Sequence, residues 1–534
     1  NAGVNINADL SLNAELHVGG DVSLNGNIFM GGTITSITGT LSTTTITGTT
    51  FSQVGSTINE MSTYNSGGNQ LYTGGTNSHY FGGSRAISDD GTTMIIGAYN
   101  AAFNSQNNNL GYVQVFKYSS GSWNQLGDTF VGSSSSSKLG YDTTINGDGT
   151  IIAMTDYVES IYVYQYNSGT DSWSQLGSTL TVTQTGANNN FPTGVDLNTN
   201  GDIIAIGNTR YDGNSGDEGA VEVYQYDSGT DSWSQLGSAI VGENANDATA
   251  NISATMSLNS DGTIIAIGSP NNSDGGSFAG HARVFQYDSG TDSWSQLGSD
   301  IDGPVVGYTF GWTLDLNHAG DILAVGTRPN SLGDGFAAVY KYSDGSWTQM
   351  GSNIVGPSDG KWFSFITCIN GVGDVVLVEC FDTDDVGIIQ MYQYDDSTET
   401  WGQIGDDIDK STSNTLNSIA LAKDTTTLVY ADYLGSTGGN IQVHTIASSS
   451  STTNLTSSSR ALVGIGVESP SYELDVSGNT NTTSLIVSSS AIMPISTPSS
   501  ASDTGTTGQV AVDTDYVYVC TATNTWKRAA LSTW

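Results

Sequence analysis

The chain has few basic residues. It carries 13 Lys and Arg against 52 Asp and Glu, which gives a formal net charge of −39 over 534 residues. A chain with this charge repels phosphate backbones, so we expect no nucleic-acid partner. No apolar run reaches the length of about 18 residues that a membrane span needs, so we expect no membrane insertion. No basic, apolar leader opens the chain at Asn1, and we interpret its start as a processed or incomplete N-terminus.

Cysteine and histidine are scarce as well. Three cysteines form no disulfide framework and do not indicate a compartment. No histidine stands at metal-ligand spacing from another, and the five are His17, His79, His281, His318 and His444. The sequence also lacks a nucleophile elbow and a phosphate-binding loop. We therefore predict no catalytic residue, no metal site, no cofactor and no enzyme, although abundant carboxylates leave a glycosidase pair possible by residue type.

What the sequence does contain is a repeated marker, Trp-x-Gln-Φ-Gly, in which Φ is an apolar residue. Successive copies lie 50 to 61 positions apart, which suits one four-stranded blade of a β-propeller. Because these aromatic residues recur at one position in every unit, we interpret them as packing between blades rather than as a sugar-stacking surface. The six copies begin at Trp123, Trp173, Trp233, Trp294, Trp347 and Trp401.

Each unit predicts four strands, A to D. A tight turn such as 259–262 follows strand A, and strand B is a continuous apolar run such as 264–268. Strand C alternates, and strand D carries the marker. A seventh set of strands A to C lacks its strand D, and residues 69–73 resemble the missing piece. We therefore predict an all-β fold with a seven-bladed β-propeller over 56–447, closed by pairing 69–73 with 440–446, which removes an open sheet edge.

The propeller segment resembles the FG-GAP repeats of integrin-α-type propellers over roughly 57–447. The motifs that carry the resemblance are Phe81-Gly82, Phe310-Gly311, Gly97-Ala98 and Gly268-Ser269-Pro270. The resemblance implies calcium in an Asp-rich turn after strand A. Here these turns hold one or two carboxylates, whereas calcium takes about six to eight oxygens. Plain hairpin turns are therefore the favoured interpretation, and calcium is the alternative.

A shorter repeat of six residues precedes the propeller, in the segment 1–55. Its apolar positions recur every six residues and are followed by small or turn-forming residues, the pattern of a β-helix. One chain would make fewer than two turns of a triangular β-helix, so we predict a homotrimeric shaft; the alternative is a longer single-chain β-helix. The predicted trimer core comprises Val4, Ile6, Leu10, Leu12, Leu16, Val18, Val22, Leu24, Ile28 and Met30.

The chain after the propeller predicts three further parts. Residues 448–460 form a Ser/Thr linker, 461–500 a second shaft-like segment, and 501–534 a small C-terminal β tip domain. Within the second part, 474–479 has the form of the hexad at 22–27, and 463–476 looks like a segment common in phage and viral tail-fibre proteins. The final part resembles the tip of fibre proteins from large algal viruses. The resemblance implies a virion fibre protein, located on the virion surface or outside the cell.

The longest predicted connections join strands B and C, at 99–110, 208–219, 269–280 and 328–335. Both flanking segments should leave the propeller on the face of the C–D turns, so the B–C connections lie on the opposite face. Loops on a rigid scaffold are frequent binding sites. We expect ligand contacts at Tyr99, Phe103, Tyr211, Phe278 and Phe336; the alternative is that these loops only fill space.

These observations favour a structural or adhesive fibre or appendage protein of a virion. Its expected partners are further copies of itself in a homotrimer, a glycan or protein of a host surface, and other virion or fibre proteins. One alternative is a secreted bacterial or algal adhesin or matrix protein. A further alternative is an enzyme that acts on surface polysaccharide.

Overall fold

The computed structural model describes most of the propeller and scattered parts of its flanks. The described residues are 3–6, 10–13, 21–24, 28–29, 42–60, 80–102, 109–183, 192, 194–209, 211–212, 218–244, 255–329, 335–356, 361–381, 386–413, 419–424, 427–433, 439–454, 463–465, 474–476, 479–481, 486–487, 498, 500–502, 504, 510–512 and 516–530. The chain divides into two units, Gly48–Ser449 on the one hand and Asn1–Thr47 with Ser450–Trp534 on the other. No helix of the described chain is long and apolar enough to cross a membrane.

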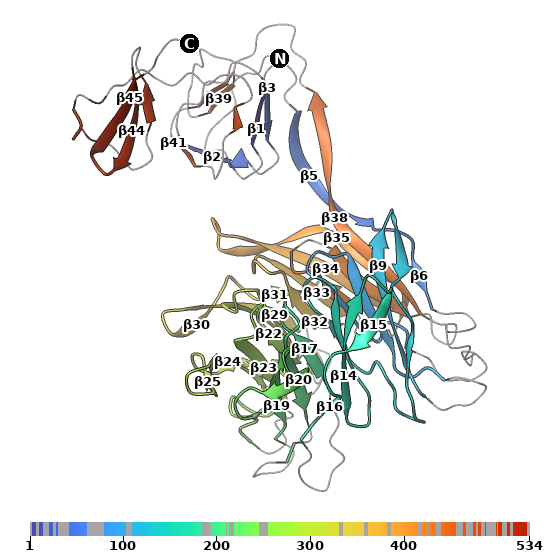
Figure 1. Cartoon of the computed structure of the whole chain (residues 1–534). Coiled ribbons are helices and arrows are strands. Elements are labelled where there is room, and N and C mark those ends of the chain that lie inside the picture. Colours follow the sequence, from blue (N-terminus) through green and yellow to red (C-terminus); the bar gives the residue numbers. More distant parts are fainter. Residues whose placement is uncertain are drawn as a thin grey trace. The chain divides into compact units, whose positions relative to one another are not determined.

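The larger unit is a seven-bladed β-propeller (Figure 1). Each blade is an antiparallel sheet of four strands, in sequence order in the first six blades, and in six of the seven blades a short strand after D also pairs with strand C. Blade 1 comprises β7 (Ser84–Ile87), β8 (Thr93–Ala98), β9 (Tyr112–Ser119), β10 (Ser122–Gln125) and β11 (Phe130–Val131). Blade 2 comprises β12 (Thr143–Ile145), β13 (Ile151–Thr155), β14 (Ser160–Asn167), β15 (Ser172–Gln175) and β16 (Leu180–Thr181). Blade 3 comprises β17 (Gly194–Leu197), β18 (Ile203–Asn208), β19 (Ala220–Asp227), β20 (Ser232–Gln235) and β21 (Ile240–Val241).

Blade 4 comprises β22 (Met256–Leu258), β23 (Ile264–Ser269), β24 (His281–Asp288), β25 (Ser293–Gln296) and β26 (Ile301–Asp302), and blade 5 comprises β27 (Thr313–Leu316), β28 (Ile322–Gly326), β29 (Phe336–Ser343), β30 (Ser346–Gln349) and β31 (Ile354–Val355). Blade 6 comprises β32 (Lys361–Ile369), β33 (Val375–Phe381), β34 (Val386–Asp395) and β35 (Thr400–Ser413). Blade 7 comprises β36 (Ile419–Leu421), β37 (Thr427–Tyr433) and β38 (Gly439–Asn454), with β5 (Ser42–Gln53) and β6 (Ile58–Asn59) from the start of the chain. Each strand A contacts the strands A of both neighbouring blades, and β36 contacts β7, which closes the ring.

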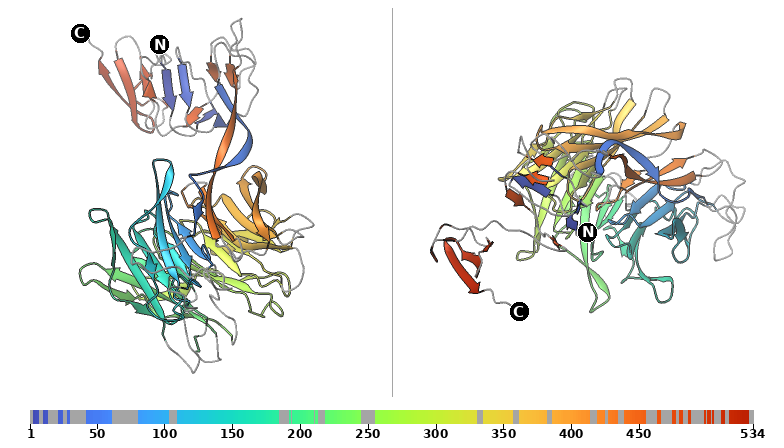
Figure 2. Two further views of the ribbon diagram at one scale, coloured as in Figure 1. Left: turned by 90° about the vertical axis from the view of Figure 1, so that its right-hand side faces the viewer. Right: turned by 90° about the horizontal axis from the view of Figure 1, so that it is seen from above.

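The last blade takes its fourth strand from residues other than those predicted. Strand C of blade 7, β38, pairs with β5 and with β6, and Ile441 lies opposite Ile58. The assignment of this strand to 69–73 is therefore wrong, and those residues lie outside the described part of the chain. The missing marker is Phe51-Ser52-Gln53-Val54-Gly55, in which Phe replaces Trp. Figure 2 shows β5 and β38 side by side where the chain enters and leaves the propeller.

The marker residues join each blade to the one before it. The indole N–H of each marker Trp donates a hydrogen bond to the carbonyl of the Φ residue in the preceding marker. The six bonds run from Trp123 to Val54, Trp173 to Leu126, Trp233 to Leu176, Trp294 to Leu236, Trp347 to Leu297 and Trp401 to Met350, at 2.8 to 2.9 Å. The interpretation of these aromatic residues as packing between blades is confirmed. The bond from Trp123 to Val54 also identifies 51–55 as the seventh marker.

A ring of backbone hydrogen bonds links the A–B turns around the axis. In every blade one N–H of this turn donates to a carbonyl in the turn of the next blade, at 2.8 to 3.0 Å. The bonds run from the N–H of the first residue to the carbonyl of the second in the pairs Asp89 to Gly147, Gly147 to Thr199, Thr199 to Ser260, Ser260 to His318, His318 to Gly371, Gly371 to Lys423, and Asp424 to Asp89. Seven such bonds return to the blade where they began, so the ring gives an independent count of the blades.

The core lies between adjacent blades. Strand B is apolar on both faces, and all six residues of β18 are buried. One core cluster, for example, combines Ile204 and Ile206 of blade 3 with Ala153 and Val163 of blade 2. This explains why strand B is a continuous apolar run, since each of its faces packs against a different sheet. Cys368, Cys380 and Cys520 are free thiols.

The described strands of the smaller unit form short sheets. β1 (Gly3–Ile6) pairs in parallel with β3 (Asp21–Leu24), and β2 (Leu10–Asn13) pairs in parallel with β4 (Ile28–Phe29). Gly3 lies opposite Asp21 and Leu10 opposite Ile28, an offset of 18 residues or three hexads, as in one turn of a single-chain β-helix. These two strand pairs are too few to establish a β-helical shaft, and the homotrimer stays a prediction.

The other strands of this unit come from the end of the chain. β42 (Ile486–Val487) and β41 (Asn479–Asn481) extend the sheets of β1 and β2, and β39 (Val463–Ile465) pairs with β40 (Leu474–Val476). β43 (Val510–Val512), β44 (Tyr516–Ala522) and β45 (Thr525–Ala530) form an antiparallel sheet of three strands. Tyr518, Cys520 and Trp526 form a small buried cluster on it. The predicted domain boundaries of the flanks stay predictions.

Candidate functional site

The propeller encloses a cavity of about 220 Å³ on its axis, lined by the strands A and the A–B turns of the seven blades. Its charged lining residues include Arg85, Asp142, Asp196, Asp315 and Lys423. Arg85 lies on β7, the inner strand of blade 1. In this strongly acidic chain, the axis therefore combines carboxylates with two of the few basic side chains.

Three of these carboxylates bind the neighbouring blade. Asp142, Asp196 and Asp315 each accept a hydrogen bond, at 2.7 to 2.8 Å, from a backbone N–H on strand A of the next blade. Lys423 Nζ lies 2.8 Å from Asp315 and also donates to the backbone carbonyls of Leu316 and Ile369. Each inner strand is an edge strand with unpaired backbone groups, and these side chains satisfy some of those groups on three of the strands.

Asp196 differs electrostatically from the other axial carboxylates. Although it reaches the cavity, protein atoms surround it, and this desolvation raises the pKa of its carboxyl to about 7, with a further upward contribution from the charge of Asp315. Hydrogen bonds from Leu258 and Leu197 act in the opposite direction. A carboxyl with a raised pKa beside a second carboxylate is an arrangement that glycoside cleavage uses.

A cluster of four tyrosines lies at the face of the B–C connections, where blades 1 and 2 meet. Tyr80 stacks on Tyr99 with ring centroids 5.1 Å apart, and Tyr99 meets Tyr141 edge to face at 5.5 Å. Tyr141 in turn packs against Tyr157 at 5.1 Å, and Lys138 Nζ lies 4.2 Å from the centre of the Tyr157 ring. We call Tyr80, Tyr99, Tyr141 and Tyr157 the tyrosine cluster; all four are half-buried, so their rings are partly open to solvent.

Blade 5 carries a related pair on the same face. The guanidinium of Arg328 lies 4.3 Å from the centre of the Trp312 ring. Trp312 follows the Phe-Gly pair that begins the blade, and Arg328 follows strand B, so the two occupy the positions of Tyr141 and Tyr157 in blade 2. Aromatic faces beside a fixed positive charge suit a sugar ring that carries a carboxylate or similar anion.

The structure places the predicted ligand residues at different sites. Tyr99 belongs to the tyrosine cluster, whereas Tyr211 and Phe278 lie on the B–C connections of blades 3 and 4, with Phe278 47% exposed. Phe336 is 5% exposed at the start of β29 and packs against Phe310, so its assignment as a ligand contact is wrong. Phe103 lies outside the described residues.

The sequence interpretation missed Tyr80, Tyr141 and Tyr157. A signal existed, because Tyr99 and Tyr157 both follow strand B by one or two residues, and Tyr80 and Tyr141 flank the start of strand A. Of the predicted trimer core, Leu16, Val18 and Met30 lie outside the described residues. The others lie on β1 to β4, where no side chain is described, so no residue of that set is tested.

Comparison with known proteins gives short matches only. No family model matches the chain. It is 55% identical over 40 residues to a depolymerase specific for capsule K30/K69 of Klebsiella phage K64-1, a match of 8% of this chain and 5% of that protein. It is 56% identical over 39 residues to depolymerase 1, specific for the same capsules, of Klebsiella phage K5-2, which covers 7% and 5%. The chain thus spans about a twentieth of the curated relatives that it matches.

Solved structures resemble the chain distantly. A candidate 6-phosphogluconolactonase of Bacteroides uniformis has a TM-score of 0.44 and 14% identity, over 61% of this chain and 85% of that one. A Lactobacillus plantarum protein has a TM-score of 0.42 and 16% identity, over 62% and 84%. The propeller assignment therefore rests on the strand pairing itself, and these two structures add no argument about function.

These comparisons contradict the prediction that the chain is not an enzyme, since both phage relatives are named as depolymerases. The prediction relied on the scattered histidines and on the lack of a nucleophile elbow and a phosphate-binding loop. Carboxylate chemistry needs none of these features, and the fold brings Asp142, Asp196 and Asp315 to one cavity. The sequence could not show this convergence, because more than 50 residues separate each of these Asp residues from the next.

Proposed function

We propose that the chain is part of a phage-type tail fibre that acts on a surface polysaccharide through the B–C face of its propeller. The observation that carries the proposal is the tyrosine cluster. Its four partly open rings lie on the face away from the strands by which the chain enters and leaves, β5 and β38. The depolymerase segments of two phages support a polysaccharide as the ligand class.

The distribution of charge further limits the class of polysaccharide that we propose as the ligand. The net charge of −39 repels anions at most of the surface, yet Lys138 and Arg328 both lie beside aromatic rings on this face. We therefore propose an acidic polysaccharide whose sugar rings stack on the tyrosines while Lys138 and Arg328 bind its anionic groups.

Binding of the full chain to immobilised capsular polysaccharides, K30 and K69 among them, tests this proposal. Tyr99→Ser with Tyr141→Ser should weaken binding by about fivefold per ring, since a stacked ring contributes about 1 kcal/mol. Tyr99→Phe should retain binding because it keeps the stacking face. Tyr287→Ser, on the side of the C–D turns, is the matched control. Equal binding by the double variant and the wild type would refute the role of the cluster.

Cleavage of the bound polysaccharide is a second candidate function. Burial raises the pKa of Asp196 to about 7, and Asp315 pairs with Lys423 in the same axial cavity. We propose that Asp196 would act as the acid and Asp315 as its carboxylate partner. Release of reducing ends should then be lost in Asp196→Asn and kept in Asp288→Asn, an exposed control. Undiminished release by Asp196→Asn would refute this assignment.

A further inference from the structure

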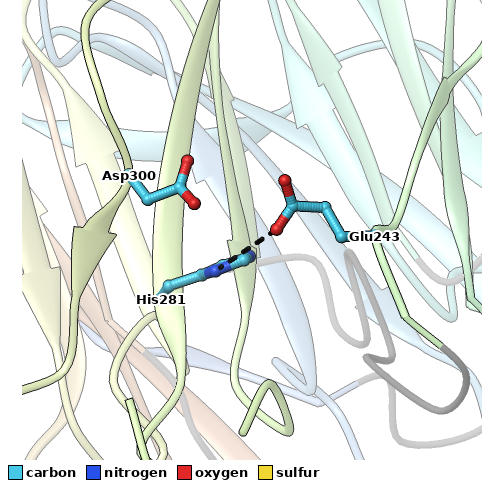
Figure 3. Close-up of side chains that lie close together, drawn as sticks. All are labelled: Glu243, His281 and Asp300. Atoms are coloured by element: carbon cyan, nitrogen blue, oxygen red, sulfur yellow. Dashed lines mark ion pairs between the residues drawn. The ribbon is translucent and has the colours of Figure 1, made fainter. Parts of the chain in front are cut away.

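A second group of side chains converges away from the axis, between blades 3 and 4. Glu243 follows β21 of blade 3, His281 begins β24, and Asp300 precedes β26. One potential metal-ligand atom from each residue lies within 4.8 Å of the other two. Figure 3 shows the two carboxylates on either side of the imidazole ring of His281.

The histidine in this group has no hydrogen-bond partner. The side chain of His281 is fully buried, and neither ring nitrogen has a partner. The nearer carboxylate oxygen of Glu243 lies 4.0 Å from Nδ1, too far for a hydrogen bond. A buried polar side chain without a partner destabilises the folded protein and requires an explanation such as a bound ion.

The internal repeat shows that these residues are peculiar to this site. Phe336 in blade 5 and Ala220 in blade 3 begin strand C where blade 4 has His281. Ser133 of blade 1 occupies the position of Glu243, two residues after the short fifth strand. Packing of the fold therefore does not require either side chain, since other blades form the same strands without them.

We propose that Glu243, His281 and Asp300 bind a divalent transition-metal ion of the zinc class, which ties blade 3 to blade 4. One imidazole nitrogen and two carboxylates are ligands that zinc accepts, with water completing a four-coordinate site. Calcium prefers six to eight oxygens and does not suit a buried imidazole. Zinc would require oxygens of Glu243 and Asp300 at about 2 Å from the ion, and both carboxylates lie at exposed side chains.

The surroundings of His281 agree with this role. Desolvation by burial and the charge of Arg283 lower the pKa of His281 to about 4, so at neutral pH its imidazole is unprotonated, as a metal ligand must be. Asp300 and Asp274 act in the opposite direction on that pKa. Arg283 lies 3.3 Å from the other oxygen of Glu243, which orients this carboxylate and leaves one oxygen toward His281.

Isothermal titration of the metal-stripped full chain with zinc chloride tests the proposal. The wild type should bind one zinc ion per chain, and calcium chloride should give no comparable heat. His281→Phe, which installs the residue of blade 5, should weaken zinc binding by at least about 100-fold. Glu243→Gln and Asp300→Asn change only accessible side chains and test the site should His281→Phe fail to fold.

The matched control is His318→Ser. His318 lies 3.5 Å from Asp89 and 3.6 Å from Asp424, so it is the other described histidine with two carboxylates nearby, and Ser260 already occupies its place in blade 4. This variant should bind zinc like the wild type. Absence of zinc binding by the wild type, unchanged binding by the Glu243 and Asp300 variants, or loss of binding in His318→Ser would each overturn the proposal.

Discussion

The marker tryptophans permit a quantitative test of how the blades are held together. Replacing Trp by Phe keeps an aromatic ring in place and removes one indole N–H, and with it the 2.8 to 2.9 Å bond to the preceding blade. Because the indoles are half-buried, water partly replaces the lost partner, and we expect a loss of about 1 kcal/mol per site. Trp173, Trp294 and Trp401 lie in alternate blades, so their effects should add to about 3 kcal/mol.

The expected change in melting temperature follows from the size of the propeller unit, Gly48–Ser449, which has 402 residues. An unfolding entropy of about 2.1 cal/mol/K per residue makes 1 kcal/mol equal to roughly 1 °C. The triple Trp→Phe variant should therefore melt about 3 to 4 °C below the wild type in scanning calorimetry.

Phe51→Trp provides the reverse test. The seventh marker lacks an indole, and a Trp at this position would place an N–H beside the carbonyl of Ile404, since Phe51 and Ile404 pack against the same cluster. The variant should melt about 1 °C higher than the wild type. A triple variant that melts within 1 °C of the wild type, or a Phe51→Trp variant that is destabilised, would refute the reasoning.

Three further predictions concern closure, assembly and pH. Removing residues 1–60 deletes β5 and β6 and leaves β38 as an open edge, so the shortened chain should aggregate; a monodisperse product in size-exclusion chromatography would contradict the closure. Light scattering should give a trimer for the full chain and a monomer for the double variant Leu16→Asp, Leu24→Asp. Each charge in the apolar centre of the trimer would reduce its stability by several kcal/mol. A monomeric full chain at micromolar concentration would contradict the proposed trimer. The Asp89 carboxylate, 3.5 Å from His318 Nε2, raises the pKa of His318, so the stabilising contribution of this imidazole is complete below about pH 6.5 and is lost as pH rises through the raised value. The melting temperatures of wild type and His318→Ser should therefore differ more at pH 5.5 than at pH 8.5, and a constant difference would exclude this linkage.

Much of the propeller could be predicted from the sequence, because every blade repeats the same local pattern. Spacing of the marker and the apolar strands B gave the blade number, and the recurrence of Trp at one position correctly indicated packing. The closing strand was misplaced because its marker begins with Phe51, while Asn69-Gln70-Leu71 offered a closer match to only part of the motif. Local similarity could not show which of two nearby segments pairs with β38.

The candidate sites could be predicted only in part. Tyr99 was identified from its loop, but its three partners come from other segments, and no periodicity links them. Phe336 was expected on a loop and instead begins β29, since strand C starts directly after the connection. A search for histidine pairs could not find the group of Glu243, His281 and Asp300, because it contains one histidine and its carboxylates lie far from that histidine in the sequence. In each case the fold, rather than sequence spacing, brings the side chains together.

A crystal structure of the full chain with an oligosaccharide from a bound capsular polysaccharide would test the central claim most directly. We predict a sugar ring stacked on Tyr99 or Tyr141, with an anionic group near Lys138, on the face of the B–C connections. A saccharide bound instead along the marker tryptophans or at the C–D turns would contradict the account.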